Sequence, residues 1–484
     1  MLFNSYEFIF IFLPISYFIY FYLNKKHLTQ SSKAFLVFAS LVFYSWWNIK
    51  YLPLILISML FNYTLGRELS KAKVSKTINK KTLLAIGVFF NLALLGYYKY
   101  SDFFLINVNR VFNSHIELLH LALPLAISFF TFQQIAYLVD SYRGETKEYD
   151  FLNYALFVTF FPQLIAGPIV HHSEMMPQFA KLKNKVVNYK NIALGLFIFS
   201  MGLFKKVVIA DTFAKWATSG FDGGATLNML EAWSATLSYT FQIYFDFSGY
   251  TDMAIGVALL FNINLPQNFF SPYKALNIQD FWRRWHITLS RFLRDYIYIP
   301  LGGNRKGEFR TYTNLFTTFL LGGIWHGAGW TFVIWGILHG AALVIHRLWK
   351  KLQINMPKIL AWFITFIFIN IAWVFFRANT FNDAIRVLKG MFLGDFILPT
   401  RLNNYLKPIK SFGITFGNWS KLYGTQEYLW LWLLGGLFIV VALPNSMELK
   451  GKFKTNIIYL TLTLIFMLSI FMLYRKTEFL YFNF

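Results

Sequence analysis

Two histidines of this chain stand among tryptophans. His286 ends the sequence Phe-Trp-Arg-Arg-Trp-His, and His326 lies within Gly-Gly-Ile-Trp-His-Gly. Burying an imidazole in apolar sequence is costly unless the ring has a hydrogen-bond partner or a chemical task. A ring that titrates near neutral pH can take a proton from a hydroxyl group and pass it on, as acyl transfer requires. We therefore expect His326 and His286 to take part in chemistry.

Glycines surround His326 on both sides, in the segment from Gly322 to Gly329. A glycine has no side chain, so neighbouring backbone or a ligand can come close to the imidazole. Trp325 lies within this segment and Trp330 directly follows it, and both are expected to support the histidine. This setting makes His326 the strongest candidate for a general base.

The other histidines have simpler interpretations. His339 and His346 lie in apolar sequence without this glycine setting and are interpreted as hydrogen-bonded core residues. His171 and His172 are adjacent, but two further credible metal ligands are missing. No metal site is therefore expected.

Basic residues are dense around His286. Within 280–296 the apolar and the basic residues each recur at steps of three and four, which predicts an amphipathic helix. Its arginines could meet lipid phosphates at the membrane interface, or they could line the entrance for a phosphate-rich cofactor, with His286 at the inner end. The candidate cofactor-binding residues are Arg283, Arg284, Arg291, Arg294, Arg305 and Lys306. No G-x-x-x-x-G-K-[ST] motif occurs, so the sequence gives no support to ATP hydrolysis.

Two carboxylates occur in an apolar stretch, Gln-Ile-Tyr-Phe-Asp-Phe-Ser-Gly-Tyr-Thr-Asp. Asp246 and Asp252 inside a membrane domain should be paired, and arginine or histidine is the expected partner. An ion pair that holds helices together and a direct supporting role in catalysis both remain open for each.

The composition predicts a protein that crosses the membrane several times. Hydrophobic residues make up 56% of the chain and charged residues only 14%, and the mean hydropathy is +0.46. One water-soluble core of this length does not need so much apolar surface. The first apolar run, Phe8 to Leu23, has no basic residues before it and is expected to be a retained span rather than a signal peptide. The chain has no cysteine, which excludes disulfides and a thiol nucleophile.

The net charge of +23 comes from short basic blocks between apolar runs, a pattern typical of membrane topology rather than of nucleic-acid binding. By the positive-inside rule most blocks are cytoplasmic, and the N-terminus is outside. The blocks are Lys25 to Lys33, Arg67 to Lys81, Lys181 to Lys190, Arg283 to Arg310, Arg347 to Lys358 and Lys450 to Lys454. We expect an all-α protein with roughly eleven transmembrane helices, plus re-entrant and amphipathic helices, because a straight span needs about 20 apolar residues. Residues 1–484 are expected to form one integral domain.

Several motifs together carry a resemblance to a known family. They are FDFSGYTDMAIG, NFFSPY, FWRRWHITLSRFLRDYIYIPLGGNRKG, LLGGIWHGAGWTFVIWGILHG and WVFFRANTFNDA. The chain resembles the membrane-bound O-acyltransferase family, in particular the branch that contains the membrane subunits of alginate and peptidoglycan O-acetyltransferases. The resemblance is strongest over about 161–378, which would be the catalytic core.

The resemblance implies a ring of tilted helices around a central funnel or tunnel. It gives His326 the place of the essential histidine of the family and His286 that of the second histidine. It also implies an acyl group from a cytoplasmic thioester, acetyl-CoA, and no metal. The acyl group would reach an extracytoplasmic cell-envelope polysaccharide through an esterase-like partner protein. A multi-pass protein of the bacterial cytoplasmic membrane fits these expectations.

The chain ends in Glu-Phe-Leu-Tyr-Phe-Asn-Phe, residues 478–484. This end resembles a terminal F-x-Y-F motif of extracellular acylation systems, in which the tyrosine relays an acyl group. Tyr481 would then be a third catalytic residue. The alternative is an aromatic anchor at the membrane interface, where tyrosine and phenylalanine are common.

Two other classes of function remain open. A transporter or flippase of lipid-linked glycans would also have many spans and buried charges, but it would not need the Trp-His-Gly motif. An acyltransferase of the same family could instead transfer D-alanine from a carrier protein or acylate proteins.

Overall fold

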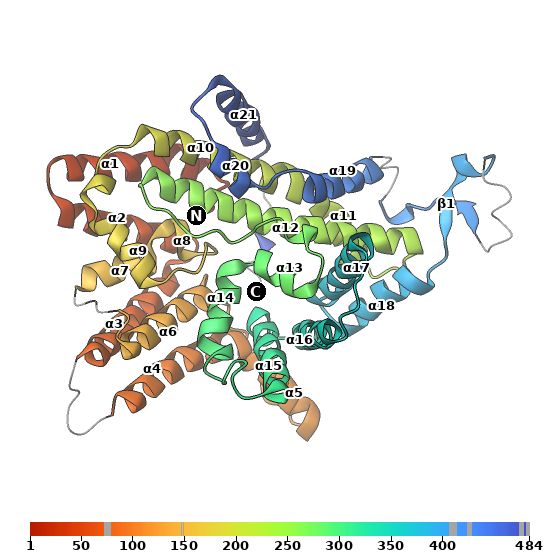
Figure 1. The fold of residues 1–484 in the computed structure, drawn as a ribbon, viewed down its shortest axis with the longest axis horizontal. Helices are drawn as coiled ribbons and strands as arrows, with labels where there is room; N and C mark the ends of the chain where they lie inside the picture. Colours follow the sequence, from red (N-terminus) through yellow and green to blue (C-terminus); the bar gives the residue numbers. More distant parts are fainter. Residues whose placement is uncertain are drawn as a thin grey trace. The chain divides into compact units, whose positions relative to one another are not determined.

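The chain is almost entirely helical in a computed structural model (Figure 1). The structure describes residues 1–71, 79–146, 148, 150–405, 414–423, 428–473 and 479–480. Within these ranges the one sheet has two short parallel strands, β1 (Ile397–Pro399) and β2 (Thr415–Gly417), with Ile397 paired to Thr415. The expected all-α class is confirmed.

The described structure divides into two compact units. Unit 1 comprises Met1–Phe204, Gly249–Asn268 and Leu449–Phe484, and unit 2 comprises Lys205–Ser248 and Phe269–Glu448. Helix α12 (Met229–Leu260) contributes residues to both units. The expectation of one functional domain, with a catalytic core at about 161–378, stays a prediction.

Unit 1 contains the N-terminal helices and the last helices of the chain. Its helices are η1 (Phe8–Phe12), α1 (Leu13–Lys25), α2 (Thr29–Ser45), η2 (Ile49–Tyr51), α3 (Leu52–Ser70), α4 (Lys80–Leu95), η3 (Gly96–Tyr100), α5 (Ser101–Phe112), α6 (Ile127–Arg143), α7 (Phe151–Thr159), α8 (Phe161–Leu164), α9 (His172–Ala180), η4 (Leu182–Lys185), α10 (Tyr189–Phe204), α21 (Ile457–Met467) and η11 (Leu468–Met472). The short helix α20 (Ser446–Lys452) joins the two units in sequence.

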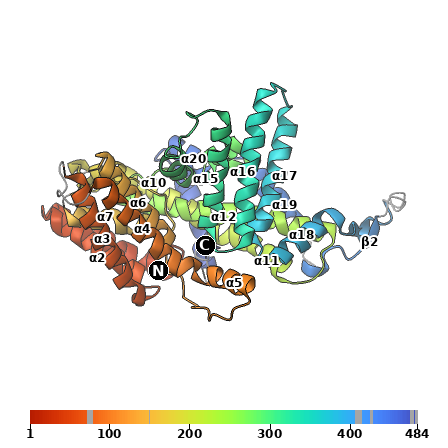
Figure 2. The same cartoon turned by 90° about the horizontal axis from the view of Figure 1, so that it is seen from below.

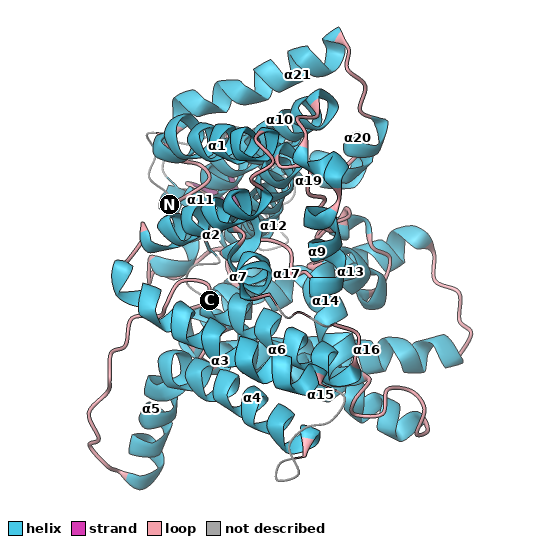
Figure 3. Cartoon of the chain, turned by 90° about the vertical axis from the view of Figure 1, so that its left-hand side faces the viewer, coloured by secondary structure: helices cyan, strands magenta, loops and turns pink. Residues whose placement is uncertain are grey.

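Helices α3, α4 and α6 of unit 1 lie side by side (Figures 1 and 3). Their apolar faces enclose a small polar network. Asn91 of α4 donates a hydrogen bond to Asn62 of α3 at 2.6 Å, and Asn62 in turn bonds to Gln134 of α6. Because buried amides must be satisfied, this network fixes how the three helices pack.

Unit 2 contains the two histidines predicted to take part in chemistry. Its further helices are η5 (Lys205–Ala210), α11 (Asp211–Asp222), η6 (Pro272–Lys274), α13 (Ile278–Arg284), α14 (Ile287–Leu293), η7 (Arg294–Tyr298), α15 (Glu308–His326), α16 (Trp330–Lys351), α17 (Lys358–Arg377), α18 (Phe381–Leu393), η8 (Thr400–Leu402), η10 (Lys421–Tyr423) and α19 (Leu429–Ala442). Helices α15, α16 and α17 run alongside one another (Figure 2).

Glycines allow α15 and α16 to meet backbone to backbone. A Cβ on Gly323 would lie 2.5 Å from the carbonyl oxygen of Phe332 and 2.8 Å from the Cα of Gly336. A Cβ on Gly336 would lie 2.7 Å from the carbonyl oxygen of Phe319. No side chain fits at these positions, so the close approach of the two helices depends on both glycines.

The chain has several helices that could span a membrane. Among the described residues six are long and apolar enough, and a bent helix pair, Leu429–Ala442 with Ser446–Lys452, would make seven. The expected number of roughly eleven is not confirmed by this count. Helix α12 is long but carries many polar residues, and α6 has only 17 residues, so length and hydropathy together do not select them.

Candidate functional site

His326 is the last residue of α15, and its side chain is only 2% exposed. Three aromatic rings surround the imidazole, with centroids 4.9 to 5.1 Å away. They belong to Trp325 on the same helix, Trp335 on α16 and Phe376 on α17. The aromatic contacts exclude water from the ring and place the imidazole in a site of low polarity.

The glycine that follows His326 is required by packing. A Cβ on Gly327 would lie 2.1 Å from the ring of Phe332, the third residue of α16. The chain is extended at Gly327 and Gly329 and turns directly into α16. The glycines therefore let α16 fold back against the end of α15, which is what places Trp335 on the imidazole.

The two predicted supporting tryptophans have different surroundings. Trp325 is buried against His326, as expected for a supporting residue. Trp330 is 55% exposed at the first position of α16. Its expected contribution to the site stays a prediction.

His286 lies at a break between α13 and α14, which corrects the expected continuous helix over 280–296. The residue has φ of 43° and ψ of 54°, so the helix cannot continue through it. This left-handed backbone is uncommon for a residue other than glycine and is a form of strain that often marks functional positions. Because of the break, basic residues before and after His286 do not share one helix face.

The side chain of His286 is fully buried in aromatic surroundings. Its ring meets Phe247 of α12 edge to face at 4.7 Å, and Phe269 lies 6.5 Å away. His286 lies outside the candidate spans, and burial lowers the pKa of its imidazole below the usual range. The ring is therefore neutral at physiological pH.

A chain of tryptophans within unit 2 connects the neighbourhoods of the two histidines. Trp285, next to His286 in sequence, packs on Trp373 of α17 at 5.0 Å. Trp373 stacks on Trp335 at 5.9 Å, and Trp335 meets His326 at 5.0 Å. The indole rings form one apolar cluster between the residues predicted to do the chemistry.

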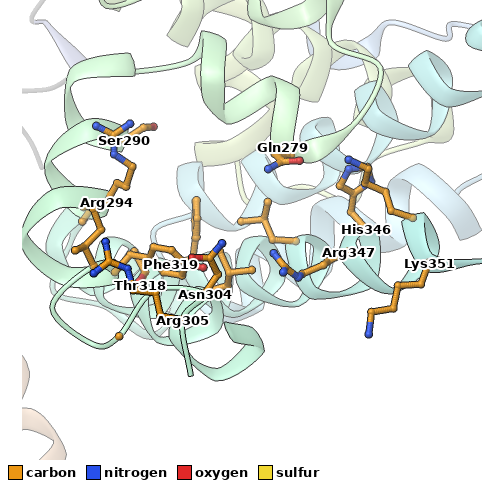
Figure 4. A pocket seen from close by; sticks show the side chains of 18 residues that line it. Gln279, Ser290, Arg294, Asn304, Arg305, Thr318, Phe319, His346, Arg347 and Lys351 are labelled. Atoms are coloured by element: carbon orange, nitrogen blue, oxygen red, sulfur yellow. The ribbon is translucent and has the colours of Figure 1, made fainter. Parts of the chain in front are cut away.

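A cationic cavity of about 760 Å³ opens in unit 2 (Figure 4). Its wall includes the side chains of Thr318 and Phe319 from α15 and the loop with Gly302 and Gly303. Both loop glycines have positive φ, at 111° and 55°, which is a backbone that glycine adopts without strain. The basic residues at this cavity are Arg294, Arg305, Arg347, Lys350 and Lys351.

The cavity contains two of the six cofactor-binding residues predicted from the sequence. Arg294 and Arg305 line it, whereas Arg283, Arg284, Arg291 and Lys306 do not. Arg284 forms an ion pair with Asp280 at 2.9 Å. The break at His286 and the following π-helical turn η7 redirect the basic side chains. A regular helical period therefore could not predict which of them line the cavity.

Three further cations at the cavity were not among the predicted site residues. Arg347, Lys350 and Lys351 lie on the last two turns of α16. Lys351 is paired with Glu308, and Arg294 with Asp295. Arg305, Arg347 and Lys350 form no salt bridge among the residues that the structure describes, although Glu308 is close enough to Arg347 for the two charges to interact. The sequence contained a signal for them, because Arg347 to Lys358 and Arg283 to Arg310 are both expected on the cytoplasmic side.

Asp246 is part of a buried ion triad. Lys206 of η5 contacts Asp246 of α12 at 2.7 Å and Asp211 of α11 at 2.8 Å. The expectation that Asp246 is paired is confirmed, but the partner is a lysine where arginine or histidine was expected. Lys206 lies in a π-helical turn, and this directs its ammonium group between the two carboxylates. The triad joins three helical elements of unit 2.

Asp252 belongs to unit 1 and is also buried. It interacts electrostatically with Lys450, whose ammonium group lies 3.4 Å from the side-chain oxygen of Asn264. Among the described residues, no group of three or more potential ligands could hold a metal ion. His171 and His172 contact carboxylates instead, those of Asp140 and Glu148.

The C-terminal tyrosine predicted as a relay, Tyr481, lies outside the described residues. The described residue nearest to it that packs closely is Phe479. Its ring is 1% exposed and lies 4.5 Å from that of Tyr250 in α12, within unit 1. Tyr250 also stacks on Phe3 at 4.8 Å. The chain is therefore buried two residues before Tyr481.

A family model described as MBOAT, membrane-bound O-acyltransferase family, matches residues 10–382, which is most of the chain. The chain belongs to the membrane-bound O-acyltransferase family. A peptidoglycan O-acetyltransferase from Helicobacter pylori is 56% identical over 423 residues, covering 81% of this chain and 80% of that protein. A probable alginate O-acetylase, AlgI, from Pseudomonas aeruginosa is 42% identical over 81% of this chain and 75% of that protein.

A more distant relative, a teichoic acid D-alanyltransferase from Streptococcus thermophilus, is 27% identical over 52% of this chain and 64% of that protein. Membership in the O-acyltransferase family and the two more similar relatives make this chain an acyltransferase of the membrane. The family match includes the whole segment from α13 to α17, which holds His286, His326 and the cationic cavity.

Replacing Lys206 by methionine is expected to destabilise the protein strongly. The substitution keeps an unbranched side chain but leaves Asp211 and Asp246 buried without their cation, a loss of about 3 to 5 kcal/mol in comparable buried pairs. Thermal unfolding of the purified protein in detergent measures the effect. Lys205→Met is the matched control, because this neighbouring lysine bonds to the hydroxyl group of Ser446. Equal melting temperatures for the two variants would contradict a structural role of the triad.

Proposed function

We propose that the chain transfers an acetyl group from cytoplasmic acetyl-CoA across the bacterial cytoplasmic membrane, for O-acetylation of a cell-envelope polysaccharide. The observation that carries the proposal is the combination of a buried histidine and a cationic cavity on one helix. Thr318 and Phe319 of α15 line the cavity, and His326 ends the same helix. A helix rises about 1.5 Å per residue, so eight residues separate Thr318 from His326 by about 12 Å. An extended thioester arm can cover this distance.

The cationic cavity is the proposed binding site for the phosphates of the donor. Arg305, Arg347 and Lys350 line the cavity and are not held in a salt bridge in the described structure, and guanidinium groups match phosphate geometry. The basic blocks that contain them are cytoplasmic by the positive-inside rule, the side on which acetyl-CoA is available. A donor with several phosphates fits five cations better than a carrier-protein thioester with one.

In the proposed reaction His326 is the general base. Its neutral ring takes the proton from an acceptor hydroxyl group as the oxygen attacks the thioester carbonyl. The carbon–sulfur bond then breaks, and coenzyme A leaves as a thiol with the proton that His326 received. His286, neutral and buried, is the second histidine of the site.

The proposed acceptor of this first transfer is Tyr481. A soluble glycan outside the membrane cannot reach coenzyme A, so a group on the protein must carry the acetyl between compartments. Burial of Phe479 against Tyr250 supports a terminal segment that packs into the protein. An aryl ester is a better acyl donor than an alkyl ester, so acetyl can pass on to the serine of an esterase-like partner outside. A ring of helices with a tunnel, the expected architecture, would give the segment its path.

The relatives indicate the polymer. Identity is higher to a peptidoglycan O-acetyltransferase, at 56%, than to an alginate O-acetylase, at 42%. We therefore propose peptidoglycan as the final acceptor. Alginate-like polymers are the second candidate, and D-alanyl transfer is less favoured because that similarity covers only about half of the chain.

His326→Ala should lower acetyl transfer by about 10² to 10⁴-fold, the usual contribution of a general base. Release of coenzyme A from acetyl-CoA by the purified protein measures the rate. His115→Ala, at an exposed loop position, is the control and should leave the rate unchanged. A well-folded His326→Ala protein with the activity of the control would remove the histidine from the mechanism.

Removing cavity charges should weaken donor binding. Arg305→Gln and Arg347→Gln are each expected to raise the KM for acetyl-CoA about tenfold, because each lost hydrogen bond to a charged group is worth about 1.5 kcal/mol. Added salt should raise the KM of the wild type as well. Lys306→Gln is the matched control, since this lysine is adjacent to Arg305 but does not line the cavity. If Lys306→Gln has the larger effect, the donor binds elsewhere.

Tyr481→Phe deletes the phenol oxygen but keeps the ring and should abolish O-acetylation of the cell-wall polymer. A phenol, with a pKa of about 10, becomes a nucleophile only when a base takes its proton. The ester content of isolated peptidoglycan and the amount of protein in the membrane are measured together. Tyr474→Phe, upstream in the same terminal segment, is the control. Normal polymer acetylation by Tyr481→Phe would leave the tyrosine as a membrane anchor only.

A further inference from the structure

His339, which the sequence pattern indicates as an ordinary core residue, accepts a hydrogen bond from a tryptophan. The indole Nε1–H of Trp282 donates to Nδ1 of His339 at 3.1 Å. The imidazole is fully buried on α16. Because Nδ1 accepts, it has no proton, so the ring proton is on Nε2 and the ring is neutral. The bond exists in this tautomer alone.

The ring of Trp282 contacts both the wall of the cavity and Trp335, the tryptophan of α16 that packs on His326. Its ring lies 4.9 Å from Phe319, which lines the cationic cavity, and 5.7 Å from Trp335. It lies on α13, four residues before His286 and thus about one helical turn away in sequence.

His339 also contacts the tryptophan that packs on His326. Trp335 lies four residues before His339 on α16, so both side chains are on one helix face. Their rings are 4.6 Å apart, and the ring of Trp335 also meets that of His326 at 5.0 Å. A single buried imidazole therefore holds Trp282 through a hydrogen bond and Trp335 through ring packing.

We propose that His339 is a positioning residue for acyl transfer, which fixes the indoles of Trp282 and Trp335 so that the ring of His326 keeps its reactive orientation. The proposal rests on the proposed role of His326 as the base. His339 does not line the cavity, so a direct contact with the donor has no support in the structure. A hydrogen bond of this kind adds only about 1 kcal/mol to stability, whereas a displacement of about 1 Å in a reacting group can cost about 10² in rate. Loss of the bond should thus affect the rate more than the stability.

The test compares variants that remove or preserve this one hydrogen bond. His339→Leu keeps volume but removes the acceptor, Trp282→Phe removes the donor, and His339→Asn offers an amide oxygen close to the position of Nδ1. His339→Leu and Trp282→Phe should each lower kcat about 10- to 100-fold with the KM for acetyl-CoA unchanged. The double variant should be no slower than either single variant, because both lose the same bond. His339→Asn should recover most of kcat.

Two measurements distinguish positioning from other roles. The indole N–H signal of Trp282, assigned by its absence in Trp282→Phe, should shift in His339→Leu and return in His339→Asn, whether or not the protein is active. The pH profile of kcat should keep the same limbs in His339→Asn as in the wild type. A His339→Asn protein as slow as His339→Leu, with a lost pH limb, would overturn the proposal in favour of proton transfer by His339.

Stability provides the remaining comparison. If kcat in His339→Leu and Trp282→Phe falls only in proportion to the fraction of protein that unfolds, His339 is purely structural and the proposal is wrong. A failure of the proposed role of His326 as the base would give a different result. It would appear as full activity of His326→Ala, while the indole signal of Trp282 still reports its bond to His339.

Discussion

Backbone contact between α15 and α16 is the constraint on which the candidate site depends. The two helices approach so closely at Gly323 and Gly336 that a methyl group at either position would overlap backbone atoms. This approach positions Trp335 against His326 at one end of α15. Nearer the start of the helix, the same contact places Phe319 and Leu343 on the wall of the cationic cavity. Small residues thus determine the location of the chemistry without touching a substrate.

A buried ion triad holds three helical elements of unit 2 together. The carboxylates of Asp211 and Asp246 share the ammonium group of Lys206, and a π-helical turn supplies the geometry for it. In a membrane environment such groups are expensive, so they need full pairing. The reacting region itself is different, because indole and phenyl rings surround both histidines. The ion triad thus stabilises the packing of the helices, and aromatic rings line the surroundings of the two histidines.

The sequence was sufficient for those parts of the site that depend on local pattern. The glycine setting of His326 and the need of Asp246 for a partner can both be derived from residue type and hydropathy. The break at His286 could not be derived from the sequence. Apolar and basic residues keep a helical period across it, although the backbone of this one residue is left-handed. Arg347 belongs to a basic block that indicates membrane topology but not a binding site. Only the packing of α16 against α15 places it at the same cavity as Arg305. The number of spans is not confirmed, because a helix such as α12 is long enough to cross a membrane but carries many polar residues, so hydropathy does not select it.

The backbone of His286 has a consequence for the evolution of stability. A glycine would adopt the left-handed conformation there without steric cost, whereas a residue with a Cβ loses about 1 kcal/mol or more. The same glycine would leave empty the space that the buried imidazole fills against Phe247, and deleting a buried ring costs about 3 to 5 kcal/mol. In a library of variants selected only for resistance to heat, this position should therefore keep a ring. The packing of the side chain maintains a backbone conformation that the local sequence alone would not favour.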